Sequence, residues 1–123
     1  MNEQFTTLLS ILLNSSTQAQ VFHRQVTGPG SFSAHKALGS YYDEIIDLVD
    51  GLAESIQGKY GIITGYGPAF AVPSVEPLSY LESLMEYVDD KREDMPADTE
   101  IQNDIDSIMT LINSTVYKLR FLA

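Results

Sequence analysis

The residues best suited to chemistry are two histidines and a set of acids that follow them along the chain. His23 and His35 are the only histidines, and Asp43, Asp50 and Glu54 come after them. Imidazole nitrogen and carboxylate oxygen are ligands that suit iron and manganese. Asp50 and Glu54 are four residues apart, so on a helix they share one face, one turn apart. The types and spacing therefore predict a site for a metal cation.

Helices must position these side chains, because apolar residues recur at steps of three and four along most of the chain. We expect helices over residues 3–26, 34–57 and 77–94, and a fourth that starts near residue 98 or 99. Residues 28–30, Gly-Pro-Gly, end the first of them. The expected N-terminal caps are Ser31 or Ser33 for the second helix, Ser74 for the third, and a capping box of Thr99 with Gln102 for the fourth.

The second helix is expected to carry the acids beside its apolar seam. At 100° per residue the seam comprises Leu38, Tyr42, Ile45, Ile46, Val49, Leu52, Ala53 and Ile56. An adjoining arc comprises His35, Asp43, Asp47, Asp50 and Glu54. Acids at the edge of a seam are expected to be half-buried against a partner. Burying them without a counter-charge is costly, and a bound cation offsets that cost.

The connection over residues 61–75 is long for a compact domain and contains three glycines and two prolines. We expect it to cross the bundle between two helices that run in the same direction. Short, long and short connections predict an all-α fold, a four-helix bundle with ferritin-like up-down-down-up topology. The 123 residues are expected to form a single domain, residues 1–123.

Composition excludes several classes of function. The net charge is −10 with only seven scattered basic residues, so direct binding of nucleic acid is not expected. The absence of cysteine excludes disulfides and thiolate metal sites. No apolar run approaches the roughly 20 residues that a membrane-spanning helix needs. Glu3 stands where a signal peptide carries positive charge, so we expect a cytoplasmic protein of a bacterium or a phage-infected host.

The stretch from Leu9 to Gly61 resembles the Dps-type mini-ferritins. In that family the first helix ends in His-x-x-x-x-Gly, the second opens with His, and an Asp-x-x-x-Glu pair follows; His23, Gly28, His35, Asp50 and Glu54 stand at these places. The resemblance implies a homo-oligomer, from a two-fold dimer to a dodecameric shell. It also implies Fe(II) bound across the two-fold axis by His23 and His35 of one subunit and Asp50 and Glu54 of the other.

Gly39 is the main departure from this pattern, because the family has an Asp there. With one carboxylate missing we expect one iron position, or weak binding at two, and Asp43 is the candidate substitute. Whether the protein is an enzyme, a ferroxidase, stays open for the same reason. Tyr41 and Tyr42 are candidates to relay electrons, with core packing as the alternative interpretation. No Glu-x-x-His motif occurs, which excludes the usual ferritin di-iron site within one subunit.

Two hypotheses of different class follow. In the first, the protein is Dps-like, binds ferrous iron at a two-fold intersubunit site, and oxidises and stores it. In the second, it is a ferritin-like oligomeric structural or interaction protein that has lost the iron chemistry. A nucleophilic enzyme has no support, because the chain has no cysteine and no recognisable Ser/His/Asp motif.

Overall fold

The computed structural model describes residues 2–67 and 76–122 of the chain. These residues form four α-helices and a short 3-10 turn, and no strand occurs among them. The helices are α1 (Asn2–Gln25), α2 (Ser31–Tyr60), α3 (Pro77–Lys91) and α4 (Thr99–Phe121), with the turn η1 (Arg92–Asp94) between the last two. The prediction of an all-α helical bundle is therefore confirmed.

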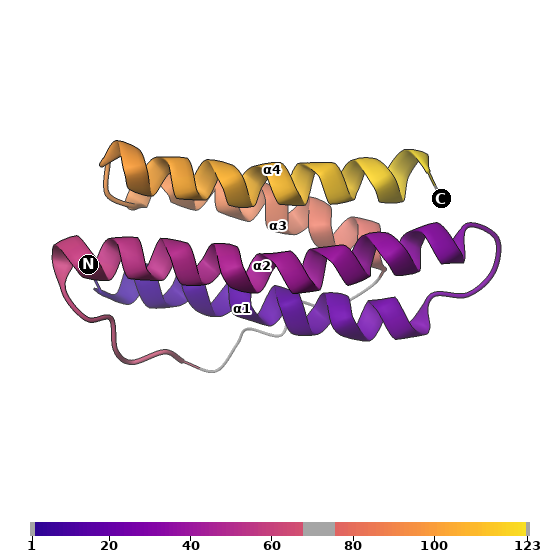
Figure 1. Ribbon diagram of the computed structural model, residues 1–123, viewed down its shortest axis with the longest axis horizontal. Coiled ribbons are helices and arrows are strands. Elements are labelled where there is room, and N and C mark those ends of the chain that lie inside the picture. Colours follow the sequence, from indigo (N-terminus) through magenta and orange to yellow (C-terminus); the bar gives the residue numbers. More distant parts are fainter. Residues whose placement is uncertain (1, 68–75, 123) are drawn as a thin grey trace.

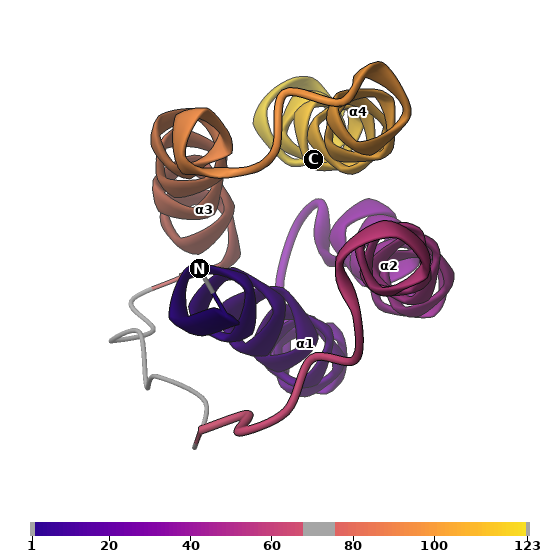
Figure 2. The same ribbon diagram turned by 90° about the vertical axis from the view of Figure 1, so that its left-hand side faces the viewer.

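The four helices lie side by side along the long axis of the molecule (Figure 1). Helices α1 and α4 run in one direction, and α2 and α3 run in the other. Viewed from one end, the helices occupy the four corners of the bundle, and the segment after α2 runs along the outside of α1 (Figure 2). Helix α2 packs chiefly against α1 and α4, α3 packs against α4, and α1 and α3 contact each other much less extensively.

One hydrophobic core runs the length of the bundle, and all four helices contribute to it. Tyr41 is completely buried in it, and its hydroxyl lies 2.7 Å from the Ser15 hydroxyl. Ser15 in turn donates to the carbonyl of Leu12. Burial raises the pKa of Tyr41 well above its usual value, although the hydrogen bond with Ser15 opposes this. The predicted seam is thus shifted: Tyr41 is the core tyrosine, Tyr42 is half-buried, and Ile46 is partly exposed.

Helix α2 is three residues longer at each end than predicted. Neither Ser31 nor Ser33 caps it, because Gly30 is the N-cap and no side chain bonds to the free amides. Gly28 and Gly30 both have positive φ, 87° and 80°, and glycine adopts this conformation without steric cost. The turn therefore reverses the chain through backbone conformation, and Ser31 becomes the first helical residue.

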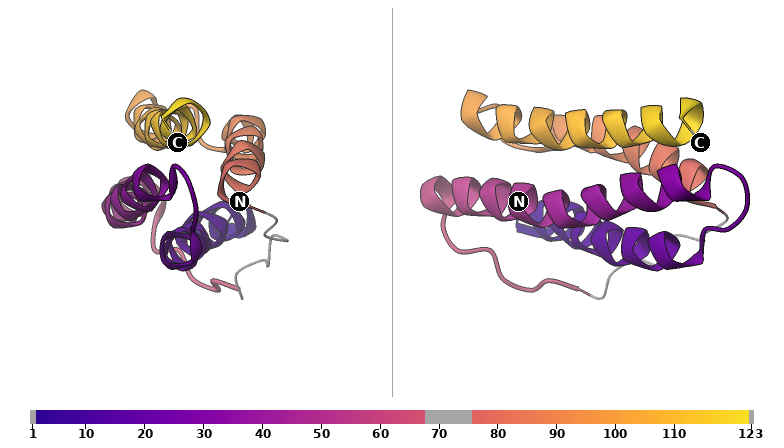
Figure 3. Two further views of the ribbon diagram at one scale, coloured as in Figure 1. Left: turned by 90° about the vertical axis from the view of Figure 1, so that its right-hand side faces the viewer. Right: turned by 45° about the vertical axis from the view of Figure 1, so that its right-hand side comes forward.

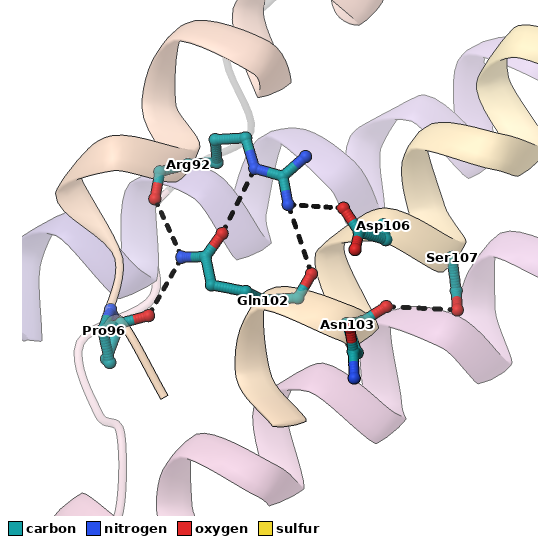
Figure 4. Close-up of polar contacts among 6 residues, drawn as sticks. All are labelled: Arg92, Pro96, Gln102, Asn103, Asp106 and Ser107. Carbon is teal, nitrogen blue, oxygen red and sulfur yellow. Dashed lines mark hydrogen bonds and ion pairs between the residues drawn. The ribbon is translucent and has the colours of Figure 1, made fainter. Parts of the chain in front are cut away.

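The turn between α3 and α4 is closed by a network around Gln102 (Figure 4). The Gln102 amide donates to the carbonyls of Arg92, at 3.1 Å, and Pro96, at 2.9 Å. The Arg92 guanidinium donates back to Gln102 and, at 2.5 Å, to Asp106. The predicted Thr99–Gln102 capping box is therefore wrong, because Thr99 is already the first helical residue and Gln102 reaches back into the turn.

The caps of α3 and α4 also differ from the prediction. Glu76 caps α3 by accepting from the Ser79 amide at 3.1 Å, and the predicted cap, Ser74, lies outside the described residues. Helix α3 ends at Lys91, and η1 covers the last three residues predicted to be helical. Asp98 is the N-cap of α4, but its carboxylate accepts from Lys59 and Tyr60 at the end of α2 instead of from its own helix.

This contact between Asp98 and α2 predicts a pH-dependent contribution to stability. The pKa of the Asp98 carboxyl is lowered, first by the hydrogen bond from Lys59 and next by that from Tyr60. A carboxyl with a lower pKa in the folded chain stabilises the fold above its unfolded pKa, and the contribution is lost as pH falls through the folded value. We expect Asp98→Asn to lower the melting temperature at pH 7, and the difference from wild type to shrink below about pH 4.

The measurement is thermal unfolding followed by circular dichroism between pH 7 and pH 3. Asp89→Asn is the matched control, because Asp89 is exposed and forms no ion pair among the residues described. A difference between Asp98→Asn and wild type that stays constant over the whole range would contradict the assignment.

Among residues 2–67 and 76–122, no helix is both long enough and apolar enough to cross a membrane. This agrees with the expectation from hydropathy.

Candidate metal site

The two histidines lie against each other where α1 ends and α2 begins. Their rings are stacked, with centroids 3.6 Å apart and planes 18° from parallel. His23 Nδ1 lies 2.7 Å from the carbonyl oxygen of His35, and His35 Nδ1 lies 2.7 Å from the carbonyl oxygen of His23. Each histidine therefore bonds to the backbone of the other, and the pair joins α1 to α2. Figure 3 shows the turn by which the chain passes from the end of α1 to the start of α2.

These bonds fix the tautomer of both rings. A carbonyl oxygen only accepts hydrogen bonds, so each Nδ1 must carry the proton and donate it. In the neutral imidazole the lone pair then lies on Nε2. Among the described residues, the buried side-chain polar atoms without a hydrogen-bond partner are the hydroxyl oxygens of Ser10 and Tyr80. The Nε2 atoms of the two histidines do not belong to this group. Histidines that bind metals usually donate the other ring N–H to a carbonyl or carboxylate in this way. Two imidazoles are thus held side by side in the tautomer that a metal ligand needs.

The position of the His23 carbonyl group explains why it accepts a hydrogen bond from the His35 ring. It belongs to the last turn of α1, where carbonyls have no partner within the helix. His35 satisfies it from the second turn of α2. Tyr42 completes the surroundings, since its ring meets the His23 ring edge-on with centroids 5.4 Å apart. Tyr42 therefore packs against the histidine pair, while Tyr41 one residue earlier belongs to the core.

Gly39 is the residue that lets the His23 ring approach α2. A Cβ atom at this position would lie 3.1 Å from Cε1 and 3.2 Å from Nδ1 of His23, closer than ordinary van der Waals contact. The His23 ring thus lies where a side chain at position 39 would begin. An aspartate here, as in the Dps-type pattern, would need the ring to move. The glycine at position 39 is thus compatible with the stacked histidine pair, and a larger residue there would crowd it.

This contact predicts different outcomes for two glycines of the same helix. Replacing a helix-interior glycine by alanine stabilises a protein by about 1 kcal/mol where there is room for the methyl group. Gly51 is exposed, and a Cβ atom added to it would have nothing within 4 Å. We expect Gly51→Ala to raise the free energy of unfolding by about 1 kcal/mol. Gly39→Ala should give no gain, because the methyl group displaces His23.

Urea unfolding of the two variants measures this difference. Gly51→Ala is the control for helix propensity, so the comparison isolates the contact with His23. Equal stabilisation by both substitutions would mean that the His23 ring is not held against α2.

The three acids of the predicted site lie elsewhere on α2 and do not meet the histidines within one chain. Asp43, Asp50 and Glu54 are all exposed, so the prediction that the seam half-buries them does not hold in a single chain. A helix rises 1.5 Å per residue, which puts Asp50 roughly 22 Å and Glu54 roughly 28 Å beyond His35. Among the described residues no group of three or more His, Asp or Glu side chains could hold a metal ion. Within one chain the histidine pair and the three acids are therefore separate groups.

Tyr66 is a neighbour of Asp50 that the sequence did not reveal. It belongs to the segment after α2 that passes α1, where it lines a hollow with Leu13 and Thr17. Partial burial raises the pKa of Tyr66, and the negative charge of Asp50 adds to the shift. Residues in a connection without helical period give no sequence signal of where they fold back. Tyr66 therefore lies within reach of the Asp50 charge, in a hollow on α1.

A family model described as "Family of unknown function (DUF5856)" matches residues 29–119. The chain belongs to this family. The DUF5856 match covers α2, α3 and nearly all of α4, and with them His35, Asp43, Asp50 and Glu54. His23 lies on α1, before the match begins. No curated protein and no solved structure matches the chain.

Proposed function

We propose that this DUF5856 protein is a Dps-like member of the ferritin-like bundles that binds ferrous iron between two subunits, at one position in each shared site. The observation that carries the proposal is the reciprocal His23–His35 pair, in which each Nδ1 donates to a carbonyl and Nε2 carries the lone pair of each neutral ring. Imidazole alone suits several transition metals, and carboxylates from a second subunit shift the preference toward iron or manganese. Iron is the substrate here, and its oxidation by oxygen or peroxide would precede storage.

The helix order supports the fold part of the proposal. Helices α2 and α3 run in the same direction and are joined by a long crossover, as in ferritin-like bundles. Side-chain sites in such bundles form where helices face each other, either in the core or between subunits. The core around Tyr41 is apolar apart from the hydrogen bond between Tyr41 and Ser15. The surface between subunits is therefore the available location for a metal site.

A two-fold contact through α2 would join the histidine pair and the acids. Suppose that two α2 helices cross antiparallel about a two-fold axis. Asp43 and Glu44 are midway in sequence between His35 and the pair Asp50 and Glu54. An axis that passes close to Asp43 and Glu44 therefore brings His35 of one subunit to the Asp50 and Glu54 positions of the other. Ile46, an exposed apolar residue, lies next to that midpoint. Asp43 would then lie near the axis instead of in the site. It remains a candidate ligand only if the axis is displaced along the helix.

Charge makes this contact dependent on a cation. The same face carries Asp43, Asp47, Asp50 and Glu54, so two such faces repel each other unless positive charge lies between them. Bound Fe(II) supplies that charge. The assembly is accordingly expected to form more readily with iron than without it.

The test adds Fe(II) anaerobically, admits air, and follows the absorbance of ferric product. The double variant His23→Ala/Glu54→Ala should lose most of the initial rate, and Asp47→Ala, an acid on the same face outside the ligand set, should keep it. Equal rates in the double variant and wild type would reject the iron function. The alternative function, an oligomeric structural protein without iron chemistry, predicts that equality together with an unchanged assembly mass.

A further inference from the structure

An exposed groove with one aromatic side chain and two lysines lies at the end of the bundle where α2 begins and α4 ends. We name it the basic groove; it is lined by Phe32, Lys36, Lys118 and Leu122 together with small residues of α2. Phe32 is 70% exposed and Leu122 is 52% exposed, and Phe121, next to Leu122 in the sequence, is 67% exposed. Large apolar side chains that are exposed together are typical of an interaction site.

The lysines of the basic groove differ from most basic residues of this chain in having no acidic partner. Lys59, Lys91, Arg92 and Arg120 all form ion pairs with carboxylates of this strongly acidic chain. Lys36 and Lys118 form none among the described residues. Lys36 lies instead over the ring of Phe32, 5.3 Å from its centroid. The groove thus combines apolar side chains with two positive charges available to an incoming molecule.

The opposite end of the same two helices carries the complementary features. We name it the acidic end; it comprises Lys59, Tyr60, Ile62, Asp98 and Glu100. Ile62 is 76% exposed and Tyr60 is 44% exposed. Asp98 is already paired with Lys59 and Tyr60, whereas Glu100, in the first turn of α4, forms no ion pair among the described residues. An exposed aliphatic residue at the same end as an unpaired carboxylate is the chemistry that an apolar groove flanked by lysines recognises.

We propose that the basic groove binds the acidic end of a second copy of this chain, with Ile62 against Phe32 and Leu122, and Glu100 near Lys36 and Lys118. The two surfaces lie at opposite ends of α2 and α4 (Figure 1), so the contact is head-to-tail. A two-fold contact of groove with groove is disfavoured, because it would bring the lysines of both copies together. Head-to-tail contacts repeat, and they give rings or open chains of subunits.

This contact is separate from the two-fold contact proposed for iron and does not depend on it. It uses neither the histidines nor the exposed acids in the middle of α2. The test is therefore run with chelator present, which removes any association that needs a metal.

The experiment uses two variants that each disable one surface. Lys36→Glu/Lys118→Glu disables the basic groove, and Ile62→Ser/Glu100→Ser disables the acidic end. All four residues are exposed, and circular dichroism checks that both variants fold. Sedimentation velocity is measured for wild type, for each variant, and for their equimolar mixture, at concentrations on the order of 100 µM, which suits a contact of micromolar affinity.

Wild type should sediment faster as concentration rises, and each variant alone should not. The mixture should again sediment faster than either variant, because the intact groove of one binds the intact end of the other. If neither wild type nor the mixture associates, the groove serves a different molecule, such as an acidic peptide, and the proposal is wrong. Association of wild type without recovery in the mixture would also overturn it, because it indicates pairing of like surfaces.

Discussion

Replacing Tyr41 with Ala should lower the free energy of unfolding by about 4 kcal/mol, the largest effect on stability expected from a single substitution here. Tyr41 has no exposed surface and packs at the centre of the bundle. Removing its ring leaves a cavity that four helices cannot close without moving. The substitution also removes the hydrogen bond between the Tyr41 and Ser15 hydroxyls.

Two further substitutions separate the ring from the hydroxyl. Tyr41→Phe keeps the ring, and Ser15 keeps its bond to the carbonyl of Leu12, so a loss of only about 1 kcal/mol is expected. Tyr117→Ala removes an exposed tyrosine of α4 and should change stability by less than about 0.5 kcal/mol. Urea unfolding measures all three. A loss below about 1 kcal/mol for Tyr41→Ala would mean that Tyr41 is not a core residue.

Replacing either histidine with Ala should weaken Fe(II) binding at least about 100-fold, because even the loss of a partner to a metal ligand costs 10- to 100-fold. His35→Ala removes an Nε2 and also the Nδ1 bond to the His23 carbonyl, so the remaining ring loses its stacked neighbour. Anaerobic calorimetric titration with Fe(II) measures the affinity. Asp47→Ala is the control, since it removes a charge from the same helix without removing a proposed ligand.

A structural role for the histidines predicts a different pattern. The His23–His35 bonds join α1 to α2 whether or not a metal binds, so both Ala variants should also lose some stability. A loss of stability with unchanged Fe(II) affinity would assign the pair to the fold alone. Glu54→Ala breaks no hydrogen bond or ion pair found among the described residues. Loss of Fe(II) affinity in both His35→Ala and Glu54→Ala would therefore support the shared site.

The helical period of the sequence was enough to predict an all-α bundle of four helices, but it did not predict how the individual helices begin and end. Apolar spacing predicted four helices, and the long connection predicted which of them run in the same direction. The N-terminal caps were wrong at α2, where two glycines with positive φ make the turn and Ser31 enters the helix. The predicted capping box of α4 was also wrong. Asp98 is the N-cap there, and its carboxylate bonds to α2, a tertiary contact that local spacing cannot reveal.

The sequence indicated His23 and His35 from their positions at the end of one helix and the start of the next, and the structure brings these two together. The prediction that they share a site with Asp50 and Glu54 stays a prediction. The sequence could not reveal that each imidazole bonds to the backbone of the other, because that depends on the register of α1 against α2. Exposure of Asp50 and Glu54 likewise depends on what packs on that side of α2, and both side chains are exposed in the part of the chain that the structure describes.

Subunit complementation tests the shared iron site most directly. His23→Ala/His35→Ala lacks the imidazole half, and Asp50→Ala/Glu54→Ala lacks the carboxylate half, so neither should bind Fe(II) alone. After the two are mixed and allowed to exchange subunits, half of the random dimers are mixed and each contains one complete site. The mixture should therefore recover about one quarter of the wild-type binding capacity in an anaerobic Fe(II) titration. No recovery in the mixture, or undiminished binding by either variant alone, would contradict a site shared between two subunits.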